Sequence, residues 1–76
     1  MALKQEIKLN APEEVKEFVN AATKCDFDID IGYNRVVIDA KSLLGVLSMD
    51  LSKVLTVSCM GYDPTFEIML QKYSQQ

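Results

Sequence analysis

The segment Val37-Ile38-Asp39-Ala40-Lys41-Ser42-Leu43-Leu44-Gly45-Val46-Leu47-Ser48 joins two kinds of secondary structure. Its first residues belong to an apolar strand that we expect over residues 36–40. Ser42 then stands directly before an apolar run, where serine is favoured as a helix cap because its hydroxyl accepts a hydrogen bond from a backbone amide of the first turn. The segment therefore predicts a strand that is followed at once by a short helix, residues 42–48, with Ser42 at its cap.

The residues before this segment predict the other half of a hairpin. Apolar and acidic side chains alternate along residues 26–31, with Phe27, Ile29 and Ile31 on one face and Asp26, Asp28 and Asp30 on the other. A period of two is typical of a strand that buries one face. Gly32-Tyr33-Asn34-Arg35 supplies turn residues between this strand and the next one. We expect the aspartate face to meet solvent.

Two longer helices are expected, one before the hairpin and one at the end of the chain. The first has Asn10 as its expected N-cap, Pro12 in its first turn and an end near Lys24. The last has Asp63 as its expected cap and Pro64 at its first helical position. Both carry apolar residues at helical spacing, namely Val15, Phe18, Val19 and Ala22 in the first and Phe66, Met69, Leu70 and Tyr73 in the last.

Two further strands complete the expected order of elements. We expect them at residues 4–9 and 54–60, the second with Leu55, Val57 and Cys59 facing inward. The order is then βαββαβα. An antiparallel four-stranded sheet with the three helices on one face is the natural two-layer solution, so the predicted class is α+β, an open-faced β-sandwich.

The composition excludes several classes of function. The chain has 76 residues, a formal net charge of −3 and a pI near 4.7, and its basic residues are scattered. This argues against a nucleic-acid partner, because affinity for a duplex rests on cations that neutralise phosphates. The first residues lack the apolar core of a signal peptide, and no apolar run approaches the length of a membrane span. We expect one domain, residues 1–76, in the cytosol.

Residues that usually bind metals are sparse. The chain has no histidine, and its two cysteines, Cys25 and Cys59, are far apart in sequence. In a cytosolic protein two thiols are usually reduced, and Cys59 falls on the apolar face of a strand, where cysteine behaves as a small hydrophobe. The aspartates of residues 26–30 stand in a line and do not surround an ion. We therefore expect reduced thiols and neither a metal nor a cofactor.

The segment from strand to short helix resembles the HPr family, the phosphocarriers of the bacterial phosphoenolpyruvate:sugar phosphotransferase system. In HPr proteins the third strand runs into the second helix through alanine or leucine, lysine and serine, then two large apolar residues and glycine, as residues 40–45 do here. Residues 18–22 resemble the family's first helix, and residues 55–58 resemble its fourth strand. Residues 61–63 resemble the start of its last helix. The resemblance implies the HPr fold, with the same order of elements.

The resemblance ends at the loop that accepts the phosphoryl group. In HPr this loop reads Gly-Leu-His-Ala-Arg-Pro, and its histidine takes a phosphoryl group from enzyme I, because an imidazole nitrogen is nucleophilic near neutral pH. Counting back from Phe18 puts Ala11 at the histidine and Glu13 at the arginine; counting forward from the first strand matches Asn10-Ala11-Pro12 to residues before a shortened loop. Neither alignment leaves an acceptor near Ala11 and Pro12. We expect a protein that is not an enzyme and does not transfer phosphate on histidine.

Ser42 has two interpretations. In many HPr proteins the serine at the matching position is phosphorylated by HPr kinase/phosphorylase, and a paralogue that lacks the histidine but keeps this serine serves carbon catabolite regulation. A phosphate there would meet the unpaired amides and the positive end of the helix dipole. Alternatively, Ser42 only caps its helix, which is the commonest role of a serine at this position.

Leu43, Leu44 and Leu47 also have two interpretations. An exposed apolar patch beside polar residues is typical of a partner-binding surface, and HPr proteins use this helix to dock onto enzyme I and the kinase. Alternatively, these leucines complete a thin core. The resemblance implies a regulatory or protein-interaction module whose partners are enzyme I, HPr kinase/phosphorylase or a transcription regulator. A binding domain or decoy that is independent of phosphorylation is the alternative.

Overall fold

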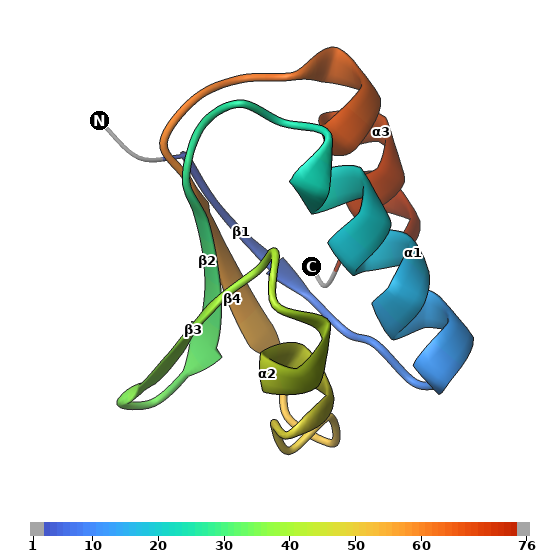
Figure 1. Cartoon of the computed structure of the whole chain (residues 1–76). Coiled ribbons are helices and arrows are strands. Elements are labelled where there is room, and N and C mark those ends of the chain that lie inside the picture. Colours follow the sequence, from blue (N-terminus) through green and yellow to red (C-terminus); the bar gives the residue numbers. More distant parts are fainter. Residues whose placement is uncertain (1–2, 75–76) are drawn as a thin grey trace.

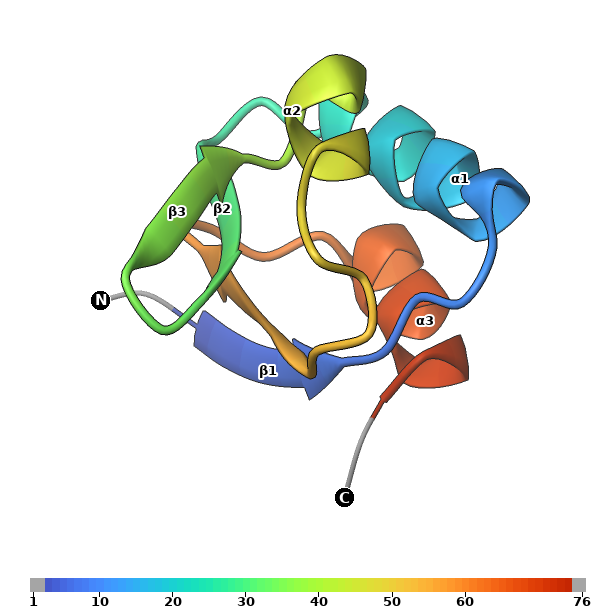
Figure 2. The ribbon, with the colours of Figure 1, turned by 90° about the horizontal axis from the view of Figure 1, so that it is seen from below.

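A computed structural model of the chain describes residues 3–74. Its elements follow the predicted order βαββαβα, and their bounds are β1 (Leu3–Ile7), α1 (Pro12–Thr23), β2 (Ile29–Tyr33), β3 (Val36–Asp39), α2 (Leu43–Leu47), β4 (Leu55–Cys59) and α3 (Pro64–Lys72). The four strands form one antiparallel sheet in the order β1-β4-β2-β3. The three helices lie on one side of this sheet, with α1 and α3 next to each other (Figures 1 and 2). The predicted α+β open-faced sandwich is confirmed.

The core lies between the sheet and the helices. Cys59 of β4 lies opposite Leu3 of β1 on one side and Ile29 of β2 on the other. Because residues opposite one another share a face of the sheet, the predicted inward face of β4 continues onto both neighbouring strands. The rings of Phe18 on α1 and Phe66 on α3 meet above this face with their centroids 5.9 Å apart. No polar or charged side chain is buried within residues 3–74. Burial of apolar surface therefore holds the two layers together.

The end of the first strand and the start of the second differ from the predicted limits. The first strand ends at Ile7 and not at Leu9, because the backbone N–H of Lys8 donates to the carbonyl of Tyr73 at 2.8 Å and the chain leaves β4. The second strand begins at Ile29 and not at Asp26, so only Asp30 of the three aspartates lies in it. Residues 26–28 instead connect the end of α1 to the sheet.

The turn between β2 and β3 is shorter than predicted. Gly32 and Tyr33 belong to β2, opposite Val37 and Val36 of β3, which leaves Asn34 and Arg35 as the turn. Asn34 has a positive φ of 51°, a conformation that asparagine adopts more readily than most residues. Gly32 is required by a close approach of the strands, since a Cβ there would lie 2.0 Å from the Val36 carbonyl oxygen.

Candidate functional site

Ser42 is the N-cap of α2, as predicted. Its hydroxyl oxygen accepts a hydrogen bond from the backbone N–H of Gly45 at 3.1 Å, and its carbonyl accepts one from Val46 at 3.0 Å. Its own N–H donates to the carbonyl of Asp39, the last residue of β3, at 3.0 Å. Because β3 runs directly into this cap, the sheet fixes the position of the serine. The side chain is half-buried.

Two further residues hold Ser42 in place, and the sequence pattern did not single them out for that role. A Cβ at Gly45 would lie 2.8 Å from a methyl of Ile38 and 2.9 Å from the Ser42 hydroxyl, so a glycine lets α2 approach β3. The carboxylate of Asp39 accepts from the N–H of Lys41 at 2.9 Å, which fixes the link between strand and helix. The glycine inside this short helix could have indicated the close packing of α2 on β3, since glycine is unfavourable in a helix unless packing requires it.

The leucines of α2 lie on its outer surface. Leu44 is 82% exposed, and Leu43 and Leu47 are 37% and 38% exposed. The helix contributes to the core through Val46, which is fully buried, and Met49 follows just after it. The interpretation that all three leucines complete the core is therefore wrong for Leu44, and it holds only partly for the other two.

The start of α1 differs from the predicted one. The N-cap is Ala11, with extended backbone angles and no side-chain cap, and not Asn10. Pro12 occupies the first helical position, and a proline favours extended geometry in the residue before it, which fits Ala11 to the cap. Glu14 closes the turn instead, because its carboxylate accepts from the N–H of Asn10 at 2.7 Å.

The charges around the start of α1 are mainly acidic. Glu13 and Glu14 both stand in the first turn, where negative charge complements the helix dipole. The ammonium of Lys8 turns toward the loop after α2 and donates to the Leu51 carbonyl at 2.7 Å, and it lies 3.4 Å from the side-chain oxygen of Asn10. An anion that approached the backbone amides of the first turn of α1 would therefore meet the carboxylates of Glu13 and Glu14 and be repelled.

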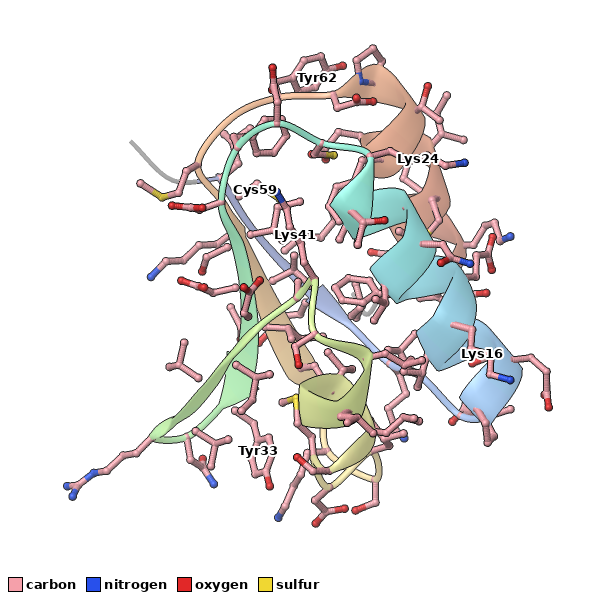
Figure 3. The ribbon with its side chains drawn as sticks, viewed as in Figure 1. Lys16, Lys24, Tyr33, Lys41, Cys59 and Tyr62 are labelled. Carbon is pink, nitrogen blue, oxygen red and sulfur yellow. The ribbon has the colours of Figure 1, made fainter. Side chains whose placement is uncertain are left out.

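The two cysteines are free and buried. Burial raises the pKa of the Cys25 thiol, and it raises the pKa of Cys59 to about 11. The ammonium of Lys41 donates to the Cys25 carbonyl at 2.9 Å, which ties the segment before α2 to the end of α1. Lys41 and Cys59 both lie between the sheet and the helices in Figure 3. Both thiols are therefore protonated at neutral pH and suited to packing.

A carboxylate also links the C-terminal helix to α1. Glu17 of α1 accepts hydrogen bonds from the ammonium of Lys72 and the hydroxyl of Tyr73. The bond from Lys72, and to a lesser extent the bond from Tyr73, holds the pKa of Glu17 below its usual value. The bond to Glu17, helped by desolvation, raises the pKa of Tyr73 to about 12.

Two hollows in the described part of the surface lie away from α2. One of about 360 Å³ lies on the open face of the sheet between Lys4, Tyr33 and Thr56, and one of about 290 Å³ lies between α1 and α3. Neither includes Ser42 or the leucines. Within residues 3–74 no three side chains that usually bind metals come together, and no helix there is long and apolar enough to cross a membrane. The exposed side of α2 is suited to contact with a protein more than to enclosure of a small molecule.

Comparison with known proteins identifies the fold. No family model matches the chain, and no curated protein is similar to it in sequence. The phosphocarrier protein HPr from Bacillus anthracis str. Ames has a TM-score of 0.72 and 21% identity, over 97% of this chain and 98% of that one. HPr-C-His from Thermoanaerobacter tengcongensis has a TM-score of 0.71 and 25% identity, over 95% of this chain and 88% of that one. The chain therefore has the fold of these HPr phosphocarrier proteins.

Proposed function

We propose that this chain is an HPr-like regulatory module that docks onto protein partners through α2 and does not carry a phosphoryl group on histidine. The observation that carries the proposal is the exposed apolar surface of Leu43, Leu44 and Leu47 beside Ser42. Leu44, which is 82% exposed, contributes little to the core, and the exposed parts of Leu43 and Leu47 lie beside it, so together they suit an apolar partner surface. We call these four residues the α2 surface.

The absence of histidine transfer is supported by the start of α1. The chain has no histidine, and Ala11 has no nucleophilic atom in its side chain. Glu13 and Glu14 bring two carboxylates to the same turn, where they would repel a phosphoryl group. Enzyme I and phosphoenolpyruvate should therefore leave the mass of the chain unchanged.

Phosphorylation of Ser42 is the regulatory step that we propose. The hydroxyl oxygen would attack the γ-phosphorus of ATP, ADP would leave, and the hydroxyl proton would pass to solvent or a base of the kinase. The phosphate would add about two negative charges next to the exposed leucines. Charge in an apolar interface is unfavourable because it must be desolvated, so the modification should weaken docking through Leu44.

The first test uses HPr kinase/phosphorylase with ATP. The expected result is the addition of one phosphate, seen by intact mass, and its complete loss in Ser42→Ala. Ser48→Ala is the matched control, because Ser48 lies at the other end of the same helix and should leave the phosphorylation intact. Absence of any added phosphate on the unaltered chain would contradict regulation through Ser42.

The second test measures docking. Leu44→Asp should weaken binding to enzyme I at least tenfold by calorimetry, since a charge at the centre of an apolar contact costs more than about 1.4 kcal/mol. Ile68→Asp is the control, because Ile68 is 66% exposed but lies on α3. Equal affinity for the two variants would place the docking surface elsewhere.

A binding module that is independent of phosphorylation is the second candidate. It is favoured by the bond between the Ser42 hydroxyl and the Gly45 amide, which already gives the serine a role as a cap. In that case the unmodified chain would bind its partner, Leu44→Asp would abolish the binding, and treatment with kinase would add no phosphate. The two tests together distinguish the candidates.

A further inference from the structure

The two edges of the sheet are not equally protected. The edge formed by β1 is closed at its end, where Ile7 makes an isolated bridge to Ser74 and Lys8 donates to the Tyr73 carbonyl. The edge formed by β3 has no strand beside it in residues 3–74, and the hairpin of β2 and β3 extends away from the helices (Figure 1). An open edge is a template for pairing with another strand.

The outward hydrogen-bonding groups of β3 follow from its register with β2. The N–H of Ala40 donates to the carbonyl of Ile29 at 2.9 Å, which makes Ile29 and Ala40 a hydrogen-bonded pair. Hydrogen-bonded pairs alternate with non-bonded ones along an antiparallel ladder, so Val37, opposite Gly32, is non-bonded. The N–H and the carbonyl of Val37 therefore point outward, away from β2. Its side chain is 66% exposed.

The charges at the two ends of β3 are self-complementary about Val37. Arg35, in the turn just before β3, lies two residues before Val37, and Asp39, the last residue of β3, lies two residues after it; both are exposed. If a second β3 pairs antiparallel with the first, Val37 opposite Val37, then the turn that carries Arg35 in each copy lies beside Asp39 of the other copy, within reach of the long arginine side chain. Charged residues usually protect an edge from pairing, but opposite charges at symmetric positions favour pairing with a copy of the same strand.

A second carboxylate strengthens the attraction for arginine. Asp30 of β2 lies directly opposite Asp39, and like charges that face each other across a sheet are unfavourable. Across the sheet, Asp30 lies opposite Ser58 of β4, and Ser58 lies opposite Lys4 of β1. The basic residue of this row, Lys4, is therefore on the opposite edge strand from Asp39. An arginine from outside would relieve the repulsion between the two aspartates.

We propose that the free edge of β3 is a self-association site, at which two copies of this chain pair antiparallel about Val37 to form one continuous sheet. The pairing is isologous, because the same strand contributes to both sides. The contact is short and confined to the edge, so the dimer is weak, with a dissociation constant on the order of 100 µM. Ser42 and the leucines of the α2 surface are not part of the contact. Asp39 is shared, because its carboxylate also accepts from the Lys41 N–H before α2, so variants of Arg35 and Val37 test self-association apart from the proposed function.

The first experiment follows the unaltered chain by sedimentation and by amide NMR signals from dilute solution up to about 1 mM. The expected result is a reversible monomer–dimer equilibrium, with concentration-dependent shifts concentrated on residues 35–39. A monomer at all concentrations would overturn the proposal. Shifts concentrated on Leu44 and Leu47 would also overturn it, because they would place the contact on α2.

The second experiment exchanges the charges. Arg35→Glu and Asp39→Lys should each weaken self-association on the order of tenfold, because each places like charges opposite one another at two symmetric positions. A mixture of the two variants should associate again, since in the heterodimer the carboxylate introduced into one chain would face the ammonium introduced into the other. Failure of the mixture to associate, with both variants folded by circular dichroism, would overturn the proposed register.

The third experiment addresses Val37, which faces its own copy at the centre of the contact. Val37→Lys should abolish association because two ammonium groups would meet there. Val37→Thr, which keeps a β-branched side chain, should leave association within about twofold. An unchanged dissociation constant for Val37→Lys would overturn the proposal. The variant should still fold, because the side chain of Val37 is largely exposed.

Discussion

The starts of α1 and α2 are two versions of the same local structure with opposite properties. The start of α1 has Ala11 as a cap without a side-chain hydrogen bond, and two glutamates in the first turn. The start of α2 has a serine hydroxyl bonded to an amide, no acidic residue in its first turn, and exposed leucines beside it. One start lacks a nucleophile and repels anions, whereas the other presents a hydroxyl within an apolar surface.

This difference shows that the two helix starts depend on different parts of the fold. The core stripe of α1, from Val15 to Ala22, is buried whatever stands at the cap, because its burial depends on residues inside the helix. The start of α2 depends on β3, since Asp39, Gly45 and Ile38 all hold Ser42 in place. Substitutions at the α1 start are therefore tolerated by the fold more easily than substitutions around Ser42.

The largest effect is expected from Gly45→Val. The added side chain would collide with Ile38 and displace the Ser42 hydroxyl, so the free energy of unfolding should fall by about 2 kcal/mol. In a domain of this size such a loss lowers the melting temperature by roughly 10 °C. Leu44→Ala on the same helix is the control and should change stability by less than about 0.5 kcal/mol. Equal stability of the two variants would mean that α2 does not need the close approach to β3.

A pair of opposite substitutions at the two caps should give intermediate effects of opposite sign. Ser42→Ala removes the bond to the Gly45 amide and should cost about 1 kcal/mol. Ala11→Ser should stabilise the chain by about 0.5 kcal/mol, because the backbone of Ala11 already has the extended geometry of a cap that lacks only an oxygen. Urea unfolding measures both, and a loss of stability in Ala11→Ser would contradict the comparison.

The smallest effect is expected at Glu17, in the middle of α1 and away from either cap. Its pKa is lowered in the folded chain, so its contribution is present above the ordinary value of 4.5 and is lost as the pH falls through the folded value. Glu17→Gln should therefore lose less than about 0.5 kcal/mol at pH 7, since the pair with Lys72 is solvent-exposed. The difference from the unaltered chain should shrink in acid.

Tyr73→Phe tests the alkaline side of the same cluster. The folded pKa of Tyr73 is raised to about 12, so its contribution is present below the ordinary value of 10 and is lost as the pH rises through 12. The phenylalanine variant should lack this loss but keep the ion pair of Glu17 with Lys72. Thermal melts of the unaltered chain and of Tyr73→Phe at a series of pH values measure this difference. Identical stability profiles of the two proteins at alkaline pH would contradict a bond between Tyr73 and Glu17.

Most of the fold could be predicted from periodicity. The apolar stripe of α1, the inward face of β4 and the caps Ser42 and Asp63 were predicted correctly, because each depends on residues close together in sequence. The stripe of α3 was also predicted correctly except for Tyr73, which is the C-cap of the helix. The strand limits at Ile7 and Ile29 were not, because contacts with distant segments decide them. The cap at Ala11 was mistaken for Asn10, since asparagine is the better cap in isolation but Pro12 fixes where the helix begins.

The sequence by itself determined the order of elements, the absence of histidine, and the serine that precedes an apolar helix, since these need only composition and local spacing. Only the tertiary structure decided which leucines of α2 are exposed. A helix of five residues has too short an apolar pattern to indicate which side meets the core, and that side is chosen by the packing of Gly45 against β3. The exposed edge of β3 was likewise decided by the order of strands in the sheet, which sequence-local patterns do not contain.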